Sequence, residues 1–236
     1  MTPLLSVRGL SKHFDGLAAV ENVSIDLPDG QVRALIGPNG AGKTTLVGMV
    51  CGRIEPTSGT VSFDGTDITA LPAHKRIMRG MAYTFQITSV FAGLSVHENV
   101  ALAARRHLKP SAIPQAVGDV LARVGLADRI EQDAGDLSYG HQRLLEIAMG
   151  LVQRPRLLIL DEPTQGLTDS EIEDFKALIR ELAGQTTILL IEHNMNVVME
   201  VADYVTVLNF GEILAEGTPD DIRANDAVQA AYLGTG

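Results

Sequence analysis

One glycine-rich segment constrains the fold of this chain more than any other feature. Residues Gly37–Thr45, with the sequence GPNGAGKTT, satisfy the pattern G-x-x-x-x-G-K-S/T with nothing missing. They follow Val32–Ile36, a candidate for a buried strand. Such glycines let the backbone curl so that several N–H groups point at one phosphate, and the next helix adds its positive N-terminal end. The segment predicts a strand, a phosphate-binding loop and a helix, in preference to an ordinary glycine-rich turn.

This loop predicts a nucleoside triphosphate as the ligand, together with Mg²⁺. Lys43 is expected to contact the β- and γ-phosphates, and the hydroxyl of Thr44 is expected to bind the metal ion. The residues expected to contact the nucleotide here are Gly37, Asn39, Gly40, Ala41, Gly42, Lys43, Thr44 and Thr45.

Two adjacent acids end a second apolar strand. Leu157–Leu160 is wholly apolar and leads directly into Asp161 and Glu162. We expect Asp161 to hold Mg²⁺, through water in the usual arrangement, and Glu162 to act as the general base on the attacking water. A pair of acids at the start of a helix is the alternative, and the phosphate loop upstream makes the catalytic interpretation the stronger one.

Strands and helices alternate along most of the chain, which predicts an α/β fold with a mostly parallel sheet. Val117, Val120, Leu121 and Val124 are spaced as one helical face. Ser170–Glu173 is interpreted as a capping box that opens another helix, and Tyr204–Leu208 with Glu212–Ala215 as a hairpin. In such sheets ligands bind at the carboxyl ends of the strands, where the phosphate loop and both acids lie.

Composition excludes several classes of protein. A net charge of −10 disfavours non-specific nucleic-acid binding, so no nucleic-acid partner is expected. The longest apolar runs are strand-length, well short of the roughly 20 residues of a membrane helix, and residues 1–10 show no secretory signal. Cys51 is the single cysteine and is expected to be a buried apolar residue.

At Leu137–Arg143, LSYGHQR, the sequence resembles the LSGGQ signature of the nucleotide-binding subunits of ABC transporters. The resemblance spans nearly the whole chain. It implies that Ser138 and Gly140 contact the γ-phosphate of an ATP held by a second subunit. It also implies that Gln86 contacts Mg²⁺ and the attacking water, and that His193 contacts the γ-phosphate. Phe14 resembles the aromatic residue that stacks on adenine, with an ordinary core phenylalanine as the alternative.

Three positions depart from the family pattern. Tyr139 replaces a glycine, His141 stands where glutamine is common, and Thr168 replaces an aspartate that helps to couple the two sites of a dimer. The other histidines, His13, His74, His97 and His107, are interpreted as surface or core residues.

The resemblance implies a P-loop NTPase (RecA-like) core with an antiparallel β subdomain and an inserted helical subdomain carrying the signature. Residues 1–236 form one nucleotide-binding domain, with residues 1–86 and 155–236 as the core and residues 87–154 as the helical part. Three stretches resemble the ATPases of branched-chain amino-acid importers: Leu137–Arg143, Ile191–Met195 and Gly217–Gly234.

The resemblance also implies partners and a location. They are integral membrane permease subunits, a second ATPase subunit, identical or distinct, and indirectly a substrate-binding protein, at the cytoplasmic face of the inner membrane. Val90 and Phe91 are candidate contacts of the permease, with simple burial as the alternative. Urea import, lipopolysaccharide export and a soluble ATPase of iron–sulfur assembly are alternative functions. The chain lacks the Asn-Lys-x-Asp segment of a GTPase.

Overall fold

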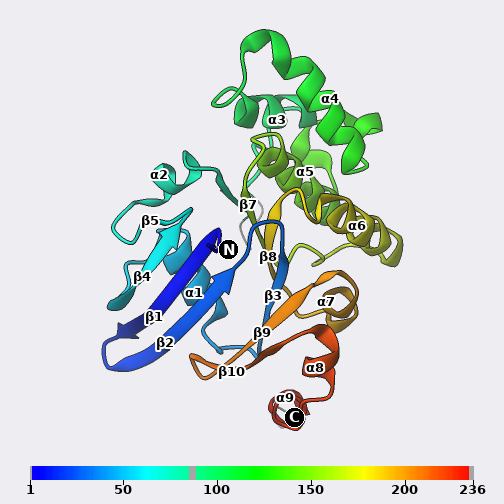
Figure 1. The fold of residues 1–236 in the computed structure, drawn as a ribbon. Helices are drawn as coiled ribbons and strands as arrows, with labels where there is room; N and C mark the ends of the chain where they lie inside the picture. The colour runs from blue at the N-terminus through cyan, green and yellow to red at the C-terminus, as the bar shows by residue number, and fades with distance from the viewer. Residues whose placement is uncertain (1, 85–88, 234–236) are drawn as a thin grey trace.

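A parallel sheet with one antiparallel edge strand forms the centre of the molecule (Figure 1). The computed structural model describes residues 2–84 and 89–233. The strand order is β10-β9-β3-β8-β7-β6, and only β10 runs antiparallel to its neighbour. These strands are β3 (Val32–Ile36), β6 (Met81–Tyr83), β7 (Leu157–Asp161), β8 (Thr187–Ile191), β9 (Tyr204–Asn209) and β10 (Glu212–Gly217).

Every residue of β3, β7 and β8 is buried, because both faces of these central strands are covered. Leu158 and Leu160 of β7 pack into a core that includes the helices after β6. Leu157 and Ile159 point to the opposite face and pack into a separate core with the helix after the phosphate loop. Successive side chains of a strand point to opposite faces, so one apolar run supplies both cores.

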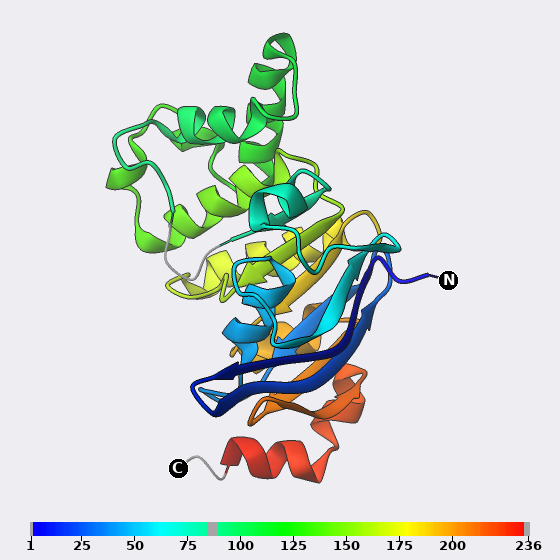
Figure 2. The ribbon, with the colours of Figure 1, turned by 90° about the vertical axis from the view of Figure 1, so that its left-hand side faces the viewer.

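A second, antiparallel sheet lies on the other side of that helix, with the strand order β2-β1-β4-β5 (Figure 2). Its strands are β1 (Leu5–Phe14), β2 (Leu17–Leu27), β4 (Ser58–Phe63) and β5 (Thr66–Asp67). A turn at Asp64-Gly65 joins β4 to β5, and both of its residues have positive φ. The antiparallel β subdomain that the resemblance implied is therefore present.

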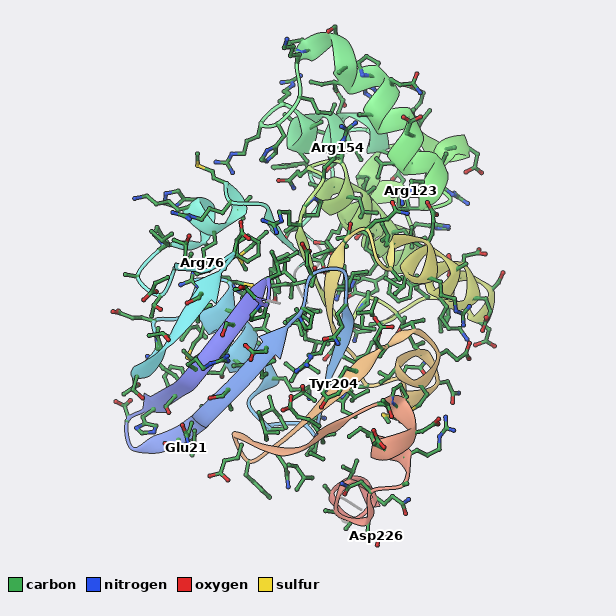
Figure 3. The ribbon with its side chains drawn as sticks, viewed as in Figure 1. Glu21, Arg76, Arg123, Arg154, Tyr204 and Asp226 are labelled. Atoms are coloured by element: carbon green, nitrogen blue, oxygen red, sulfur yellow. The ribbon has the colours of Figure 1, made fainter. Side chains whose placement is uncertain are left out.

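The buried side chain of Arg76 fixes helix α1 (Lys43–Val50) at its C-terminal end (Figure 3). Arg76 belongs to α2 (Ala73–Ile77) and is 1% exposed. Its Nη1 donates to the carbonyls of Met49 and Val50, at 2.8 and 2.7 Å. The last carbonyls of a helix have no partner within the helix, so a buried guanidinium there satisfies them.

Helices fill the chain between β6 and β7. They are α3 (Val96–Ala104), α4 (Ile113–Arg123) and α5 (Tyr139–Leu151), and they form the upper part of the molecule in Figure 1. The predicted helical face of α4 is confirmed, since Val117, Val120, Leu121 and Val124 are all buried. The core of these helices continues onto one face of the central sheet. The predicted boundaries of the helical subdomain, at residues 87 and 154, stay a prediction.

The helix after the two acids begins earlier than the sequence indicated. The predicted capping box Ser170–Glu173 is wrong, because α6 (Asp169–Leu182) is capped by Thr168. The Thr168 hydroxyl accepts from the Glu171 backbone, and the Glu171 carboxylate accepts from the Thr168 N–H at 2.7 Å. Thr168 and Glu171 satisfy the same three-residue spacing two positions upstream, so spacing alone did not distinguish them.

The chain ends in the predicted hairpin of β9 and β10 and in three short helices around it. These are α7 (Met195–Val201), which precedes the hairpin, and α8 (Pro219–Arg223) and α9 (Asp226–Leu233), which follow it. Val198, Val205, Ile222 and Val228 share a small core there. Of the helices in the described ranges, none combines the length and the apolar character that crossing a bilayer requires.

Candidate active site

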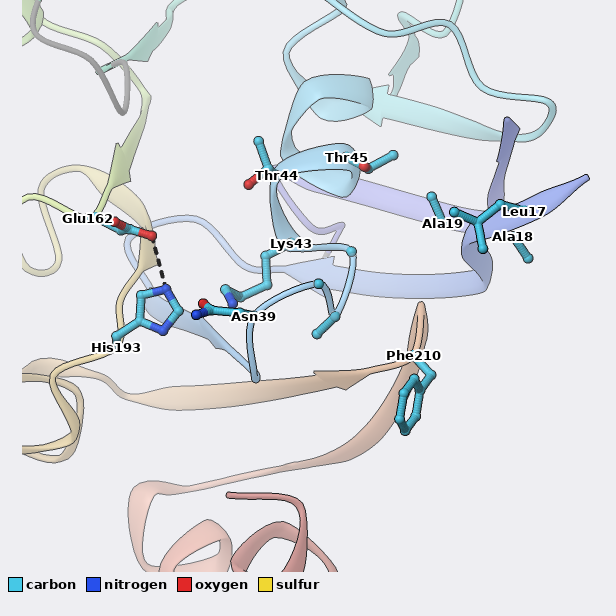
Figure 4. Close-up of a pocket in the computed structure, with 13 residues that line it drawn as sticks. Leu17, Ala18, Ala19, Asn39, Lys43, Thr44, Thr45, Glu162, His193 and Phe210 are labelled. Carbon is cyan, nitrogen blue, oxygen red and sulfur yellow. Dashed lines mark hydrogen bonds and ion pairs between the residues drawn. The ribbon is translucent and has the colours of Figure 1, made fainter. Parts of the chain in front are cut away.

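The phosphate loop lies between β3 and α1, and two neighbouring backbones restrict it to glycine at two positions (Figure 4). A Cβ on Gly37 would lie 2.2 Å from the carbonyl oxygen of Leu208, and one on Gly42 would lie 2.4 Å from that of Ala19. Gly42 also has a φ of 98°. Strands β9 and β2 therefore approach the loop so closely that only hydrogen fits.

The loop borders a pocket of about 360 Å³ at the N-terminal end of α1. Glu162 and His193 lie at one end of this pocket, and Leu17 and Phe210 at the other (Figure 4). The lining residues are Leu17, Ala18, Ala19, Asn39, Gly40, Ala41, Gly42, Lys43, Thr44, Thr45, Glu162, His193 and Phe210.

Lys43 is buried and holds the loop in its curled form. Its Nζ donates to the carbonyl oxygens of Gly37 and Pro38, at 2.7 and 3.1 Å. Burial lowers the pKa of Lys43, while the nearby carboxylates of Glu162 and Asp161 act in the opposite direction. An ammonium group thus faces the pocket with only neutral carbonyls as direct partners among the described residues.

Asp161 ends β7 and is 2% exposed. The Tyr83 hydroxyl at the end of β6 donates to Asp161 Oδ2 at 2.7 Å. Burial raises the pKa of Asp161, and the hydrogen bond from Tyr83 partly offsets this. The Arg53 guanidinium lies 4.6 Å from the centre of the Tyr83 ring. Tyr83 thus fixes one oxygen of the carboxylate, and sequence reasoning did not identify it as a site residue.

Glu162 and His193 are in direct contact. His193 Nε2 lies 2.9 Å from Glu162 Oε1 (Figure 4). Glu162 has a φ of 51°, a left-handed conformation that is uncommon for residues other than glycine. Its N–H donates to the carbonyl oxygen of Ile191, so the turn after β7 is tied to the end of β8. The two strand ends therefore present this acid and this histidine to the same pocket.

A buried carboxylate that the sequence analysis missed joins the same two segments. Glu192 is 3% exposed. Its Oε1 accepts from the N–H and hydroxyl of Thr164, at 3.1 and 2.5 Å. Its Oε2 accepts from the N–H groups of His193 and Asn194, at 2.9 and 3.1 Å. The available signal was an acid directly after an apolar strand and next to His193.

The predicted site residues divide into two groups. The pocket contains the predicted loop residues 39–45 together with Glu162 and His193. Among the described residues, Asp161, Ser138, Gly140, Phe14 and Gly37 are not part of its lining, and the carbonyl of Gly37 accepts from Lys43 instead. Gln86 lies outside the described residues. Leu17, at the start of β2, and Phe210, in the turn after β9, line the pocket without having been predicted, because an isolated apolar residue gives no chemical signal.

A phosphate loop between β3 and α1, beside acids at the end of a parallel strand, defines an NTPase of the P-loop class. Comparison with known proteins narrows this class. Residues 20–165 match the family model described as ABC transporter, and residues 212–236 match one described as branched-chain amino acid ATP-binding cassette transporter. The chain belongs to the ABC transporter family, as an ATP-hydrolysing subunit.

Individual relatives agree with this assignment. The chain is 41% identical to the high-affinity branched-chain amino acid transport ATP-binding protein BraF of Pseudomonas aeruginosa, over 98% of each chain. It is 42% identical to the LivG protein of Escherichia coli K12, which has the same description, again over 98% of each chain. Among solved structures, the ADP conformation of MJ1267, an ATP-binding cassette of an ABC transporter, has a TM-score of 0.89. That structure is 26% identical, and the match covers 99% of this chain and 100% of MJ1267.

Proposed function

We propose that this protein is the ATPase subunit of an importer of branched-chain or other hydrophobic amino acids. The match of residues 212–236 to the branched-chain model supports this substrate class over urea import, lipopolysaccharide export or iron–sulfur assembly. On this proposal the protein is peripheral at the cytoplasmic face of the inner membrane. There it works with permease subunits and, through them, with a substrate-binding protein.

The separation of the signature from the phosphate loop is the observation that supports the proposal that two subunits act together. Ser138 and Gly140 do not line the pocket that contains Lys43. The signature of one subunit therefore serves the ATP of a second subunit, identical or distinct. ATP binding closes this pair because each nucleotide contacts both chains, and hydrolysis opens it again.

Within each pocket, the side chains divide the chemistry. Lys43 neutralises the β- and γ-phosphates, and N–H groups of residues 39–45 donate to them. Glu162 accepts the proton of the attacking water, and His193 contacts the γ-phosphate. The contact between Glu162 and His193 at 2.9 Å supports this assignment because it brings base and phosphate contact together.

The oxygen donors in this region fit Mg²⁺. No group of three or more His, Cys, Asp or Glu side chains that could enclose a metal ion occurs in residues 2–84 and 89–233. Mg²⁺ characteristically takes one or two protein oxygens and completes its shell with phosphates and water. Thr44 and Asp161 would supply these oxygens, with Gln86 as a further predicted ligand, and the bound ion would neutralise charge on the phosphates.

The permease contact is proposed at Phe91. Phe91 is 55% exposed, while Val90 packs partly against the helical core. The buried Asn99 fixes the backbone beneath this ring, since its side chain exchanges hydrogen bonds with the N–H and carbonyl of Phe91, at 2.8 and 3.1 Å. An exposed aromatic ring on a fixed backbone suits an inserted helix of another chain.

We expect Phe91→Asp to abolish copurification of the permease subunits in mild detergent while leaving ATP affinity unchanged. Burying a carboxylate in an apolar contact is strongly unfavourable. Leu102→Asp, which changes another exposed apolar side chain of the helical region, is the matched control and should retain the permease. Recovery of multi-span chains by the wild-type protein would support transport, and recovery of soluble partners alone would overturn it. Equal recovery with Phe91→Asp would rule out this contact.

The adenine is proposed to contact Leu17 and Phe210 at the open end of the pocket. Phe210 is 85% exposed at the tip of the β9–β10 hairpin. The next residue, Gly211, donates to the carbonyl of Ala41 at 3.0 Å and accepts from the N–H of Glu21 at 2.9 Å. These bonds fix the backbone of the hairpin tip relative to the phosphate loop, so Phe210 is held beside the site.

Phe210→Ala should weaken ATP binding by at least about fivefold, because a base–aromatic contact contributes about 1–3 kcal/mol. Phe14→Ala is the matched variant and should have a smaller effect. Tripolyphosphate, which has no base, should bind both variants as it binds the wild type. A larger loss of ATP affinity with Phe14→Ala would instead support the original prediction that Phe14 stacks on the base. Titration calorimetry measures all three proteins.

A further inference from the structure

All three departures from the family pattern lie where the start of α5 meets the segment that leads into α6. The Tyr139 ring lies against Gly166, where an added Cβ would be 2.5 Å from Tyr139 Cδ1. A Cβ on Gly140 would likewise lie 2.8 Å from the Gly166 carbonyl oxygen. His141 and Thr168 both contact Glu171. The signature is therefore packed directly onto the chain that follows Glu162.

A chain of polar contacts runs from the signature serine to the cap of α6. The Ser138 hydroxyl lies 2.7 Å from His141 Nδ1. The other ring nitrogen, His141 Nε2, lies 3.3 Å from Glu171 Oε1. Glu171 Oε2 accepts from the N–H and the hydroxyl of Thr168, at 2.7 and 2.8 Å. Each end of the imidazole thus has one oxygen partner.

These two partners favour one of the two neutral tautomers of the imidazole. The hydrogen bonds from Thr168 and the nearby positive charge of Arg129 help to lower the pKa of Glu171, so its oxygens act as acceptors. A hydrogen on His141 Nε2 is favoured, because a bare Nε2 would set its lone pair against this carboxylate at 3.3 Å. A neutral imidazole has only one ring hydrogen, so Nδ1 is an acceptor and the Ser138 hydroxyl donates to it.

In this arrangement the Ser138 hydrogen is committed to His141 Nδ1, at 2.7 Å from the hydroxyl oxygen. Ser138 Oγ also accepts from the backbone N–H of His141 at 3.2 Å, as the cap of α5. Phosphate oxygens only accept hydrogen bonds, so Ser138 can serve them only when its hydrogen is free. When His141 gains a proton, Nδ1 becomes a donor to Ser138 Oγ, the hydroxyl hydrogen is released, and a positive charge is added beside the phosphate.

We propose that His141 is a positioning residue that sets the donor direction of Ser138, and that engagement of ATP by the signature is accompanied by protonation of His141. This role rests on the proposed pairing of two subunits. Glu171 faces His141 from α6, and the positive charge of Arg129 lies near enough to help lower the pKa of that carboxyl. On α5 itself, Arg143 lies over the Tyr139 ring, 5.6 Å from its centre.

The first test is the tautomer of His141 in the free subunit at pH 8, read from long-range ¹H–¹⁵N correlation spectra of the imidazole. We expect the hydrogen on Nε2. Observation of the hydrogen on Nδ1 would overturn the proposal, whatever the behaviour of the ATP-bound pair, because Ser138 would then already be free to donate.

The second test is the pH dependence of ATP-driven association between pH 6 and 8. It uses the Glu162→Gln protein, with its companion ATPase where copurification recovers one, in analytical ultracentrifugation. Association should strengthen on acidification by up to about tenfold per pH unit for each His141 that takes up a proton. His141→Gln in the same background should remove this dependence, since an amide donates at every pH, and its melting temperature checks that it is folded.

His193 is present in both proteins, so the difference between their two pH profiles reports on His141. An equal pH dependence with and without His141 would overturn the role of His141 while leaving the pairing intact. A failure of both proteins to associate with ATP at any pH would overturn the pairing itself, and this role with it.

Discussion

Glu162→Gln should lower ATP hydrolysis by about 10²–10⁴-fold, the usual contribution of a general base. The amide keeps the shape of the side chain and can still contact His193, now 2.9 Å from Glu162, but it cannot take a proton from water. ATP binding should be retained, so the two-subunit state should accumulate instead of turning over. Phosphate release measures the rate, and light scattering during gel filtration measures the association.

Glu181→Gln is a suitable control because Glu181 is an exposed acid of α6 that pairs with Arg123 and does not line the pocket. It should hydrolyse ATP at the wild-type rate. If Glu162→Gln retains wild-type activity, another group must activate the water. If it binds ATP yet stays monomeric in the presence of every copurifying ATPase, the proposed pairing is wrong.

Lys43→Met should weaken ATP binding by about 100-fold or more, because charge-assisted hydrogen bonds to phosphate are among the strongest polar contacts. The effect on folding should be much smaller. Methionine removes a buried ammonium group, and burial lowers the pKa of that group. The substitution also leaves the carbonyls of Gly37 and Pro38 without this donor. We expect the melting temperature of the nucleotide-free protein to change by only a few degrees, about 2–4 °C per kcal/mol in a chain of this size.

Substitution of a second lysine is the control that distinguishes the loss of the Lys43 contact from a general loss of positive charge. Lys75 is exposed on α2 and does not line the pocket. Lys75→Met should bind ATP as the wild type does. Tight ATP binding by Lys43→Met in titration calorimetry would mean that backbone N–H groups alone hold the phosphates.

The fold was largely predictable because its strongest signals are local. The runs Leu157–Leu160 and Ile188–Ile191, which lie in β7 and β8, are wholly apolar, as strands of a sheet covered on both faces should be. The start of α6 was less predictable, since two overlapping segments satisfy one capping pattern and the contact between Thr168 and Glu171 decides between them. The brief helices α2 and α8 have too few residues to show a periodic pattern.

The candidate site was predictable where chemistry depends on short sequence patterns. The phosphate loop and Glu162 lie within such patterns, and the pocket contains them. Glu192 and Tyr83 were missed because their importance arises from partners far away in the chain, such as Thr164 and Asp161. Phe210 was missed for a similar reason, since only the folded hairpin brings it beside the loop.

The Glu192 carboxylate has a mechanical consequence for the reaction cycle. Its two oxygens hold the segment after β7 through Thr164 and the segment after β8 through His193 and Asn194. We therefore expect the turn that carries Glu162 and the turn that carries His193 to move together. If phosphate release displaces His193, Glu162 should move with it. The general base and the phosphate contact would then leave their catalytic positions together, and Glu162 would not remain in place to activate water when no ATP is bound.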